Sequence, residues 1–172
     1  TGSVKWQIDL KSKYSIRIPT WGIAATPLIF ENKIILHIGG SDGASILALD
    51  KNSGKELWRA SDDKISYSAP ILIRQAGKPV VVVWTAENLN GLDPLTGKIF
   101  WKIPFSVRMG MGISTPVKYK DYLFVSCFFS GSLLVKLNNE TVSAEKVWLR
   151  VGESEQKTDA LHCVINTPVI KD

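Results

Sequence analysis

Positions that vary between otherwise similar repeat units are the first place to look for chemistry in this chain. Prolines recur near the start of four similar segments, at Pro27, Pro70, Pro116 and Pro168. The residue six positions before each proline changes from one segment to the next: it is Trp21, Lys64, Gly110 and His162. One equivalent position thus carries an aromatic ring, a cation, no side chain and an imidazole. We expect ligand binding where a regular repeat varies in this way.

Further polar and aromatic side chains flank these positions. Glu87 and Asn88 follow an apolar run of the middle unit, and their oxygens suit calcium, but the sequence places no third carboxylate beside them. No grouping of serine, histidine and aspartate indicates a hydrolase, since His37 lies within an apolar run. We predict no catalytic residue and no metal site, but a ligand-binding set that comprises Trp21, Lys64, Tyr67, Glu87, Asn88, Arg108, His162 and Asn166.

Charge and hydrophobicity exclude several classes of partner. The 172 residues carry a formal net charge of +5, and the lysines are scattered. Proteins that bind nucleic acid usually concentrate basic residues on one face or helix. No apolar run reaches the roughly 20 residues that a membrane-spanning helix needs. Residues 1–4 lack the basic and apolar regions of a signal peptide. We therefore expect no nucleic acid, no membrane span and no signal peptide within this chain.

The two cysteines leave two interpretations open. Cys127 and Cys163 are 36 residues apart, and each has apolar neighbours. They are either small buried hydrophobic residues or the two halves of a disulfide, which spacing alone does not decide. Because the chain has no Cys-x-x-Cys pair and no Cys/His ligand set, we expect no structural zinc.

A phrase that ends in tryptophan recurs after 43 residues. Its first copy contains Asp50, Gly54 and Trp58, and its second contains Asp93, Gly97 and Trp101. An internal repeat of this length indicates a propeller, a solenoid or another array. Each unit holds four apolar runs that are rich in β-branched and aromatic residues and lack a helical period, which predicts four strands per unit.

The middle strands favour stacked blades over a two-sheet sandwich. Residues 34–38 and 80–84 are apolar almost without interruption, which is typical of strands buried on both faces. Radially packed four-stranded sheets bury their strands in this way. We predict an all-β partial β-propeller with about three antiparallel blades, at residues 24–60, 67–104 and 113–151. Residues 1–10 are expected to be the last strand of a preceding blade, and residues 162–172 the first strand of a following one.

The aspartate–glycine turn has a local physical reason. The aspartate caps backbone N–H groups, the glycine supplies a left-handed position, and the tryptophan is expected on the outermost strand, packed toward a neighbouring blade. In the third unit Asn138 replaces the aspartate, no glycine follows, and Trp148 arrives two residues late, so we expect a longer loop there. Blade docking, not catalysis, is predicted for Asp50, Gly54, Trp58, Asp93, Gly97, Trp101 and Trp148.

These phrases resemble the tryptophan-docking motif of the PQQ-like propeller repeats of quinoprotein alcohol dehydrogenases and BamB-like proteins. The Thr/Ala-Pro starts of the four segments resemble the first strands of that family, and the likeness spans essentially the whole chain. It implies a ring of seven or eight blades. Three blades cannot close such a ring, so we expect either a piece of a longer protein or association between copies through open blade edges.

The resemblance leaves the function open between two classes. One is a non-catalytic scaffold or sensor that binds a protein or ligand, with no cofactor. The other is a fragment of a dehydrogenase that uses PQQ with calcium, although the adjacent cysteine pair of many such enzymes is missing here. We expect the scaffold, with a protein partner or the remaining blades of a longer chain. The family resemblance also implies a periplasmic or extracellular location.

Overall fold

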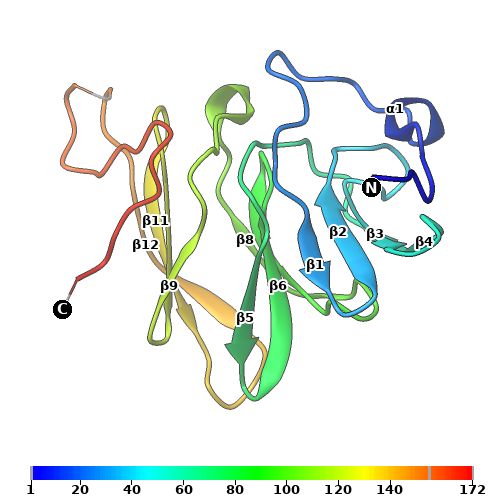
Figure 1. Cartoon of the computed structure of the whole chain (residues 1–172). Helices are drawn as coiled ribbons and strands as arrows, with labels where there is room; N and C mark the ends of the chain where they lie inside the picture. Colours follow the sequence, from blue (N-terminus) through cyan, green and yellow to red (C-terminus); the bar gives the residue numbers. More distant parts are fainter. Residues whose placement is uncertain (1, 155, 172) are drawn as a thin grey trace.

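Three antiparallel sheets of four strands each form the body of the chain (Figure 1). The computed structural model describes residues 2–154 and 156–171. The first blade contains β1 (Leu28–Phe30), β2 (Lys33–His37), β3 (Ile46–Asp50) and β4 (Glu56–Ala60). The second contains β5 (Ile71–Gln75), β6 (Lys78–Trp84), β7 (Asn88–Leu92) and β8 (Ile99–Pro104). The third contains β9 (Val117–Tyr119), β10 (Tyr122–Cys127), β11 (Gly131–Leu137) and β12 (Ala144–Arg150).

In each blade the strands pair in chain order, so every connection within a blade is a hairpin. The blades lie side by side in Figure 1, and the helical segments of the described residues, α1 (Leu10–Lys13) and η1 (Arg108–Gly110), are short. The prediction of a partial β-propeller with about three four-stranded blades is confirmed.

In each blade, residues that pair across the four neighbouring strands form a row, and an equivalent row in each blade ends on a tryptophan. The rows are Leu28–Ile35–Ala48–Trp58, Ile71–Val82–Gly91–Trp101 and Val117–Phe124–Leu134–Trp148. The first row packs in the core between the first and second blades, and the second row packs in the core between the second and third. The third row faces away from the second blade, and all four of its members are only half-buried.

Continuous apolar strands lie where both faces of a blade are covered. In β6, Val81 and Val83 pack toward the first blade, while Val80, Val82 and Trp84 pack in the core shared with the third blade. All five are fully buried. The uninterrupted apolar run in the sequence therefore reflects a strand between two neighbouring sheets.

Tryptophans from one segment contact the turn between the third and fourth strands of the next. The Trp6 indole N–H donates to the Lys51 carbonyl at 2.9 Å, and the Trp58 N–H donates to the Pro94 carbonyl at 3.1 Å. A Cβ atom on Gly97 would lie only 2.6 Å from the Trp58 ring. The glycine of the repeated phrase thus leaves room for the indole of the preceding blade.

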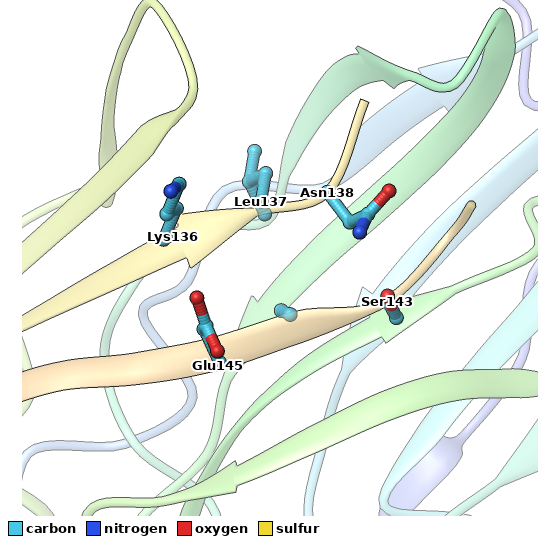
Figure 2. A pocket seen from close by; sticks show the side chains of 6 residues that line it. Lys136, Leu137, Asn138, Ser143 and Glu145 are labelled. Carbon is cyan, nitrogen blue, oxygen red and sulfur yellow. The ribbon is translucent and has the colours of Figure 1, made fainter. Parts of the chain in front are cut away.

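In the third blade, Trp101 reaches the β11–β12 turn indirectly, through the side chain of Gln75. The Trp101 indole N–H donates to Gln75 Oε1 at 3.0 Å, and Gln75 Nε2 donates to the carbonyls of Asn138 and Ser143 at 3.2 and 2.6 Å. Figure 2 shows Asn138 where β11 ends and Ser143 where β12 begins, and both residues line a hollow of about 330 Å³. The expected longer loop is wrong, because six residues separate the strands both here (138–143) and between β7 and β8 (93–98); Trp148 comes late because β11 and β12 pair further toward the turn. Asn138 Oδ1 also accepts N–H bonds from Glu140 and Thr141, so the asparagine caps the turn as expected.

Segments outside the blades lie against the first and third sheets. Trp6, Ile8 and Leu10 belong to a cluster with Leu47 and Leu49, so the N-terminal segment covers the free face of the first blade. Residues 2–9 and 162–171 form no strand in the part of the chain that the structure describes, and Leu10 begins α1. A strand needs a hydrogen-bonded neighbour, so the assignment of these segments to adjacent blades stays a prediction. Thr1 and Asp172 lie outside the described residues.

Two further features concern the cysteines and the membrane. Both cysteines are free thiols: Cys127 is buried against the second blade, and Cys163 is half-buried. The structure therefore shows no disulfide between Cys127 and Cys163, and it contradicts that one of the two interpretations. Within the described residues, no helix has the length and hydrophobicity needed to cross a bilayer.

Candidate functional site

A cleft of about 730 Å³ opens where loops from the first two blades meet the N-terminal segment. In Figure 1 these loops lie at the upper ends of the strands, where the blue segment between α1 and β1 arches over the sheets and η1 projects. The lining comes from five parts of the chain: Arg17, Ile18, Pro19, Thr20, Gly39, Lys64, Ile65, Ala86, Glu87, Ser106, Val107, Met109 and Gly110.

Backbone hydrogen bonds fix three of the lining loops to one another. The Ala86 N–H donates to the Lys64 carbonyl at 3.0 Å, and the Val107 N–H donates to the Ala86 carbonyl at 2.8 Å. The Phe105 N–H donates to the Glu87 carbonyl at 3.0 Å. Because these bonds link the β4–β5, β6–β7 and β8–β9 loops, the walls that these three loops form are fixed relative to one another.

Five predicted site residues lie in or beside the cleft. Lys64 and Glu87 line it. The Trp21 N–H lies 3.4 Å from Tyr67 Oη, and the two rings meet edge to face with centroids 5.7 Å apart. Arg108 precedes the lining residue Met109, and its guanidinium lies 5.1 Å from the centroid of the Phe129 ring.

Three predicted site residues have other surroundings. Asn88 Nδ2 donates to Asp63 at 2.9 Å, so its amide belongs to a buried cluster. His162 lies on the C-terminal segment, where Nδ1 is 2.5 Å from the Phe128 carbonyl and Nε2 is 3.0 Å from Thr158 Oγ1. Asn166 is exposed on the same segment. The structure therefore does not bring these three side chains into the cleft, and ligand contact by any of the eight residues stays a prediction.

Sequence reasoning missed the wall formed by residues 17–20. These residues precede Trp21 and lie outside the predicted blades, in the stretch that leads into the first one. One sequence feature could have revealed them: the stretch between Trp6 and Pro27 is longer than the corresponding stretch between Trp58 and Pro70. Such extra segments on a regular scaffold often carry binding residues.

A buried carboxylate organises the polar groups beneath the cleft. Asp63 Oδ2 accepts hydrogen bonds from Thr85 Oγ1 at 2.8 Å, Asn88 Nδ2 at 2.9 Å and Asn90 Nδ2 at 3.4 Å. Its other oxygen pairs with Lys102 Nζ at 3.1 Å. Burial raises the pKa of Asp63, but the hydrogen bonds from Asn88, Thr85 and Lys102 outweigh it and hold the pKa below its usual value.

His37 lies next to this cluster as a neutral side chain. It is 2% exposed, and neither ring nitrogen makes a hydrogen bond to the described residues. Burial lowers the pKa of His37 from 6.5 to about 4, while the Asp63 carboxylate and the Lys64 backbone oppose this shift more weakly. His37 is therefore the core residue that its apolar surroundings in the sequence indicate.

The depressed pKa of His37 predicts a pH-dependent stability. Below pH 6.5 the unfolded chain binds a proton at His37 that the folded chain binds only near pH 4. The free energy of unfolding is thus expected to fall by about 3 kcal/mol as the pH drops through this window, at about 1.4 kcal/mol per unit of pKa difference. Urea unfolding at a series of pH values measures it.

The control for this pH dependence is His37→Leu, which removes the titrating group. The slope between these pH values should then disappear, whatever the variant does to the absolute stability. An unchanged slope in His37→Leu would contradict the assignment. NMR should show the imidazole of His37 titrating near pH 4, and His162→Gln assigns the other histidine resonance.

Comparison with solved structures identifies the architecture. BamB from Moraxella catarrhalis is 22% identical and superposes with a TM-score of 0.55, over 78% of this chain and 42% of that chain. Quinohemoprotein alcohol dehydrogenase from Comamonas testosteroni is 18% identical, with a TM-score of 0.48, over 80% of this chain and 22% of that chain. The chain thus spans less than half the length of either protein. The first likeness shows a shared fold.

Sequence comparison names the family. No curated protein sequence matches the chain significantly. The sequence profile described as "Outer membrane protein assembly factor BamB" matches residues 1–164, which is nearly the whole chain. The blades, their equivalent tryptophan rows and this match agree, and the chain belongs to the BamB-type family of PQQ-like propeller repeats.

Proposed function

We propose that this chain is part of a non-catalytic PQQ-like propeller that binds a segment of a partner protein in the cleft. The observation that carries the proposal is a group of exposed apolar side chains around the cleft. Ile18, Trp21 and Met109 are 51%, 55% and 61% exposed. Apolar side chains gathered in this way are typical of interaction surfaces. A peptide that covered them would remove that area from water.

The protein-binding proposal also draws on the family. The name of the matching profile describes an assembly factor of outer membrane proteins, which supports a role in contacts between proteins. We propose a periplasmic or extracellular location on the same ground. We also propose that the indole contacts of Trp6, Trp58 and Trp101 dock neighbouring blades, so that they serve the scaffold and take no part in binding.

The donor groups of the cleft do not fit the PQQ–calcium pair of the second function class. Calcium takes six to eight oxygen ligands. The cleft lining offers the carboxylate of Glu87, whereas the amide of Asn88 is directed to Asp63. Within the described residues, no group of three or more His, Cys, Asp and Glu side chains could hold a metal ion. The donor set therefore favours the scaffold over a dehydrogenase fragment.

Binding of an immobilised peptide library tests the proposal. Trp21→Ala combined with Met109→Ala should weaken the binding of peptides selected by the wild-type chain by about tenfold, as truncation of interface anchors does. Leu72→Ala combined with Leu95→Ala is the matched control, because these exposed apolar residues lie away from the cleft. Equal losses in both double variants would contradict the assignment of the cleft.

Calorimetry separates the two function classes. Titration of the chain with PQQ in the presence and absence of calcium should show no calcium-dependent binding if the chain is a scaffold. Tight binding that requires calcium would replace the scaffold with a fragment of a quinoprotein dehydrogenase.

A further inference from the structure

Two cations of the cleft have no acidic partner in the described part of the chain. Arg17 and Lys64 both line the cleft, and the ion pairs of residues 2–154 and 156–171 join other groups. Both side chains belong to exposed residues. The two residues come from different elements, Arg17 from the N-terminal segment and Lys64 from the β4–β5 loop. Positive charge is thus presented from two walls.

A third cation extends this charge along the rim. Arg108 is exposed, its backbone N–H donates to Ser130 Oγ at 3.3 Å, and its guanidinium rests near the Phe129 ring. The position of Arg108 is therefore fixed from the third blade, while η1 carries the neighbouring Met109 into the cleft lining. The cleft and its rim hold three cations and one carboxylate, that of Glu87.

The rest of the cleft surface is largely apolar. Ile65, Ala86 and Val107 contribute to the lining from three adjacent loops, and Val107 and Ala86 are buried. An apolar side chain placed against these residues loses contact with water, which favours binding in proportion to the area covered. A carboxylate beside it can reach Arg17, whose planar guanidinium binds a carboxylate through two parallel N–H bonds, or Lys64.

We propose that the cleft selects protein segments in which acidic residues flank an apolar side chain; this inference rests on the function proposed above. The apolar side chain lies against the loops that carry Ile65 and Val107, and the acidic groups meet the cations on either wall. Glu87 distinguishes this ligand from a polyanion. A nucleic acid brings a continuous row of phosphates, which the carboxylate repels, and has no aliphatic side chain for the apolar surface.

Synthetic peptides test the selectivity directly. The probes share one short sequence of glycine and serine around the core Asp-Phe-Asp, with Asn-Phe-Asn and Lys-Phe-Lys cores as analogues. Fluorescence anisotropy with the whole chain should show the Asp-Phe-Asp peptide binding about tenfold more tightly than the Asn-Phe-Asn peptide at low salt, and the advantage should shrink as salt is added. The Lys-Phe-Lys peptide should bind most weakly.

Charge reversal identifies the residues responsible. Arg17→Glu combined with Lys64→Glu should abolish the preference for aspartate, so that the Asp-Phe-Asp peptide binds no more tightly than the Asn-Phe-Asn peptide. The control combines Lys78→Glu with Lys118→Glu, two exposed lysines outside the cleft lining, which changes the net charge equally. Loss of the preference in the control as well would assign it to overall charge and overturn the proposal.

Three other outcomes are informative. Equal binding of the Asp-Phe-Asp and Asn-Phe-Asn peptides would overturn the acidic selectivity while leaving the proposed peptide scaffold intact. Failure of every peptide to bind, including those from the library, would overturn both. A single-stranded oligonucleotide that binds more tightly than the Asp-Phe-Asp peptide, and competes with it, would replace the peptide with a nucleic acid as the ligand.

Discussion

Replacing Gly97 by alanine is expected to destabilise the protein by about 3 kcal/mol, whereas the same replacement at Gly77 costs only about 1 kcal/mol. Both glycines have a left-handed backbone, with φ of +76° and +73°, so both variants carry the same conformational strain. They differ in surroundings. A Cβ on Gly97 meets the Trp58 ring at 2.6 Å, while a Cβ on Gly77 has no atom within 4 Å. The difference therefore isolates the contact between blades.

A double-mutant cycle with Trp58→Ala completes this test. Trp58→Ala alone is expected to cost about 3–5 kcal/mol, because it leaves a cavity between two sheets and removes the bond to the Pro94 carbonyl. In that background Gly97→Ala should cost no more than Gly77→Ala does. Urea unfolding of the four variants gives the free energies. Equal costs for the two glycine variants in the wild-type background would show that the tryptophan contact does not stabilise the blades.

Replacing Asp63 by alanine is expected to lower the free energy of unfolding by about 3–4 kcal/mol at neutral pH. The variant removes the acceptor shared by Thr85, Asn88 and Asn90, and leaves Lys102 without its partner. Asn90 is fully buried and cannot turn to solvent for a replacement. The cost thus comes from buried donors that lose their acceptor.

Asp159→Ala is the matched control for the Asp63 variant. Asp159 also pairs with a cation, the guanidinium of Arg150, but at 3.7 Å and with an 81% exposed side chain, so its removal should leave the stability nearly unchanged. Chemical denaturation measures both variants. The pH dependence adds a second check, since the lowered pKa of Asp63 predicts that its contribution is fully present above pH 3.8 and is lost only below it. The pH range in which the Asp63 contribution is lost therefore lies below the pH range in which protonation of His37 lowers the stability.

The repeated part of the chain was the predictable part. The spacing of Trp58 and Trp101 predicts units of four strands, and the apolar run at 80–84 predicts strands covered on both faces; the structure confirms both. These predictions succeed because burial acts on every unit in the same way. The longer loop expected after Asn138 was wrong: the sequence shows that Trp148 comes two residues late, but not that these residues extend β11 and β12 instead of the turn.

The candidate site was predictable only in part. Lys64 and Glu87 were found because they occupy variable positions of a regular repeat. Residues 17–20 were missed because they lie before the first predicted blade, outside the positions that were compared between units. Asn88 was assigned to a ligand because its sequence neighbours do not reveal that its amide faces Asp63. The bridging role of Gln75 is equally hidden, since it depends on the position of a side chain from another blade.

The indole contacts all point in one direction along the chain. Trp6 reaches the turn at Lys51, Trp58 reaches the turn at Pro94, and Trp101 reaches the turn at Asn138 through Gln75. Each of the three blades therefore receives one tryptophan, and the first two blades each supply one. A tandem duplication of a gene segment that encodes one unit would bring both halves of the contact with it. Arrays of this kind can lengthen during evolution without inventing a new interface.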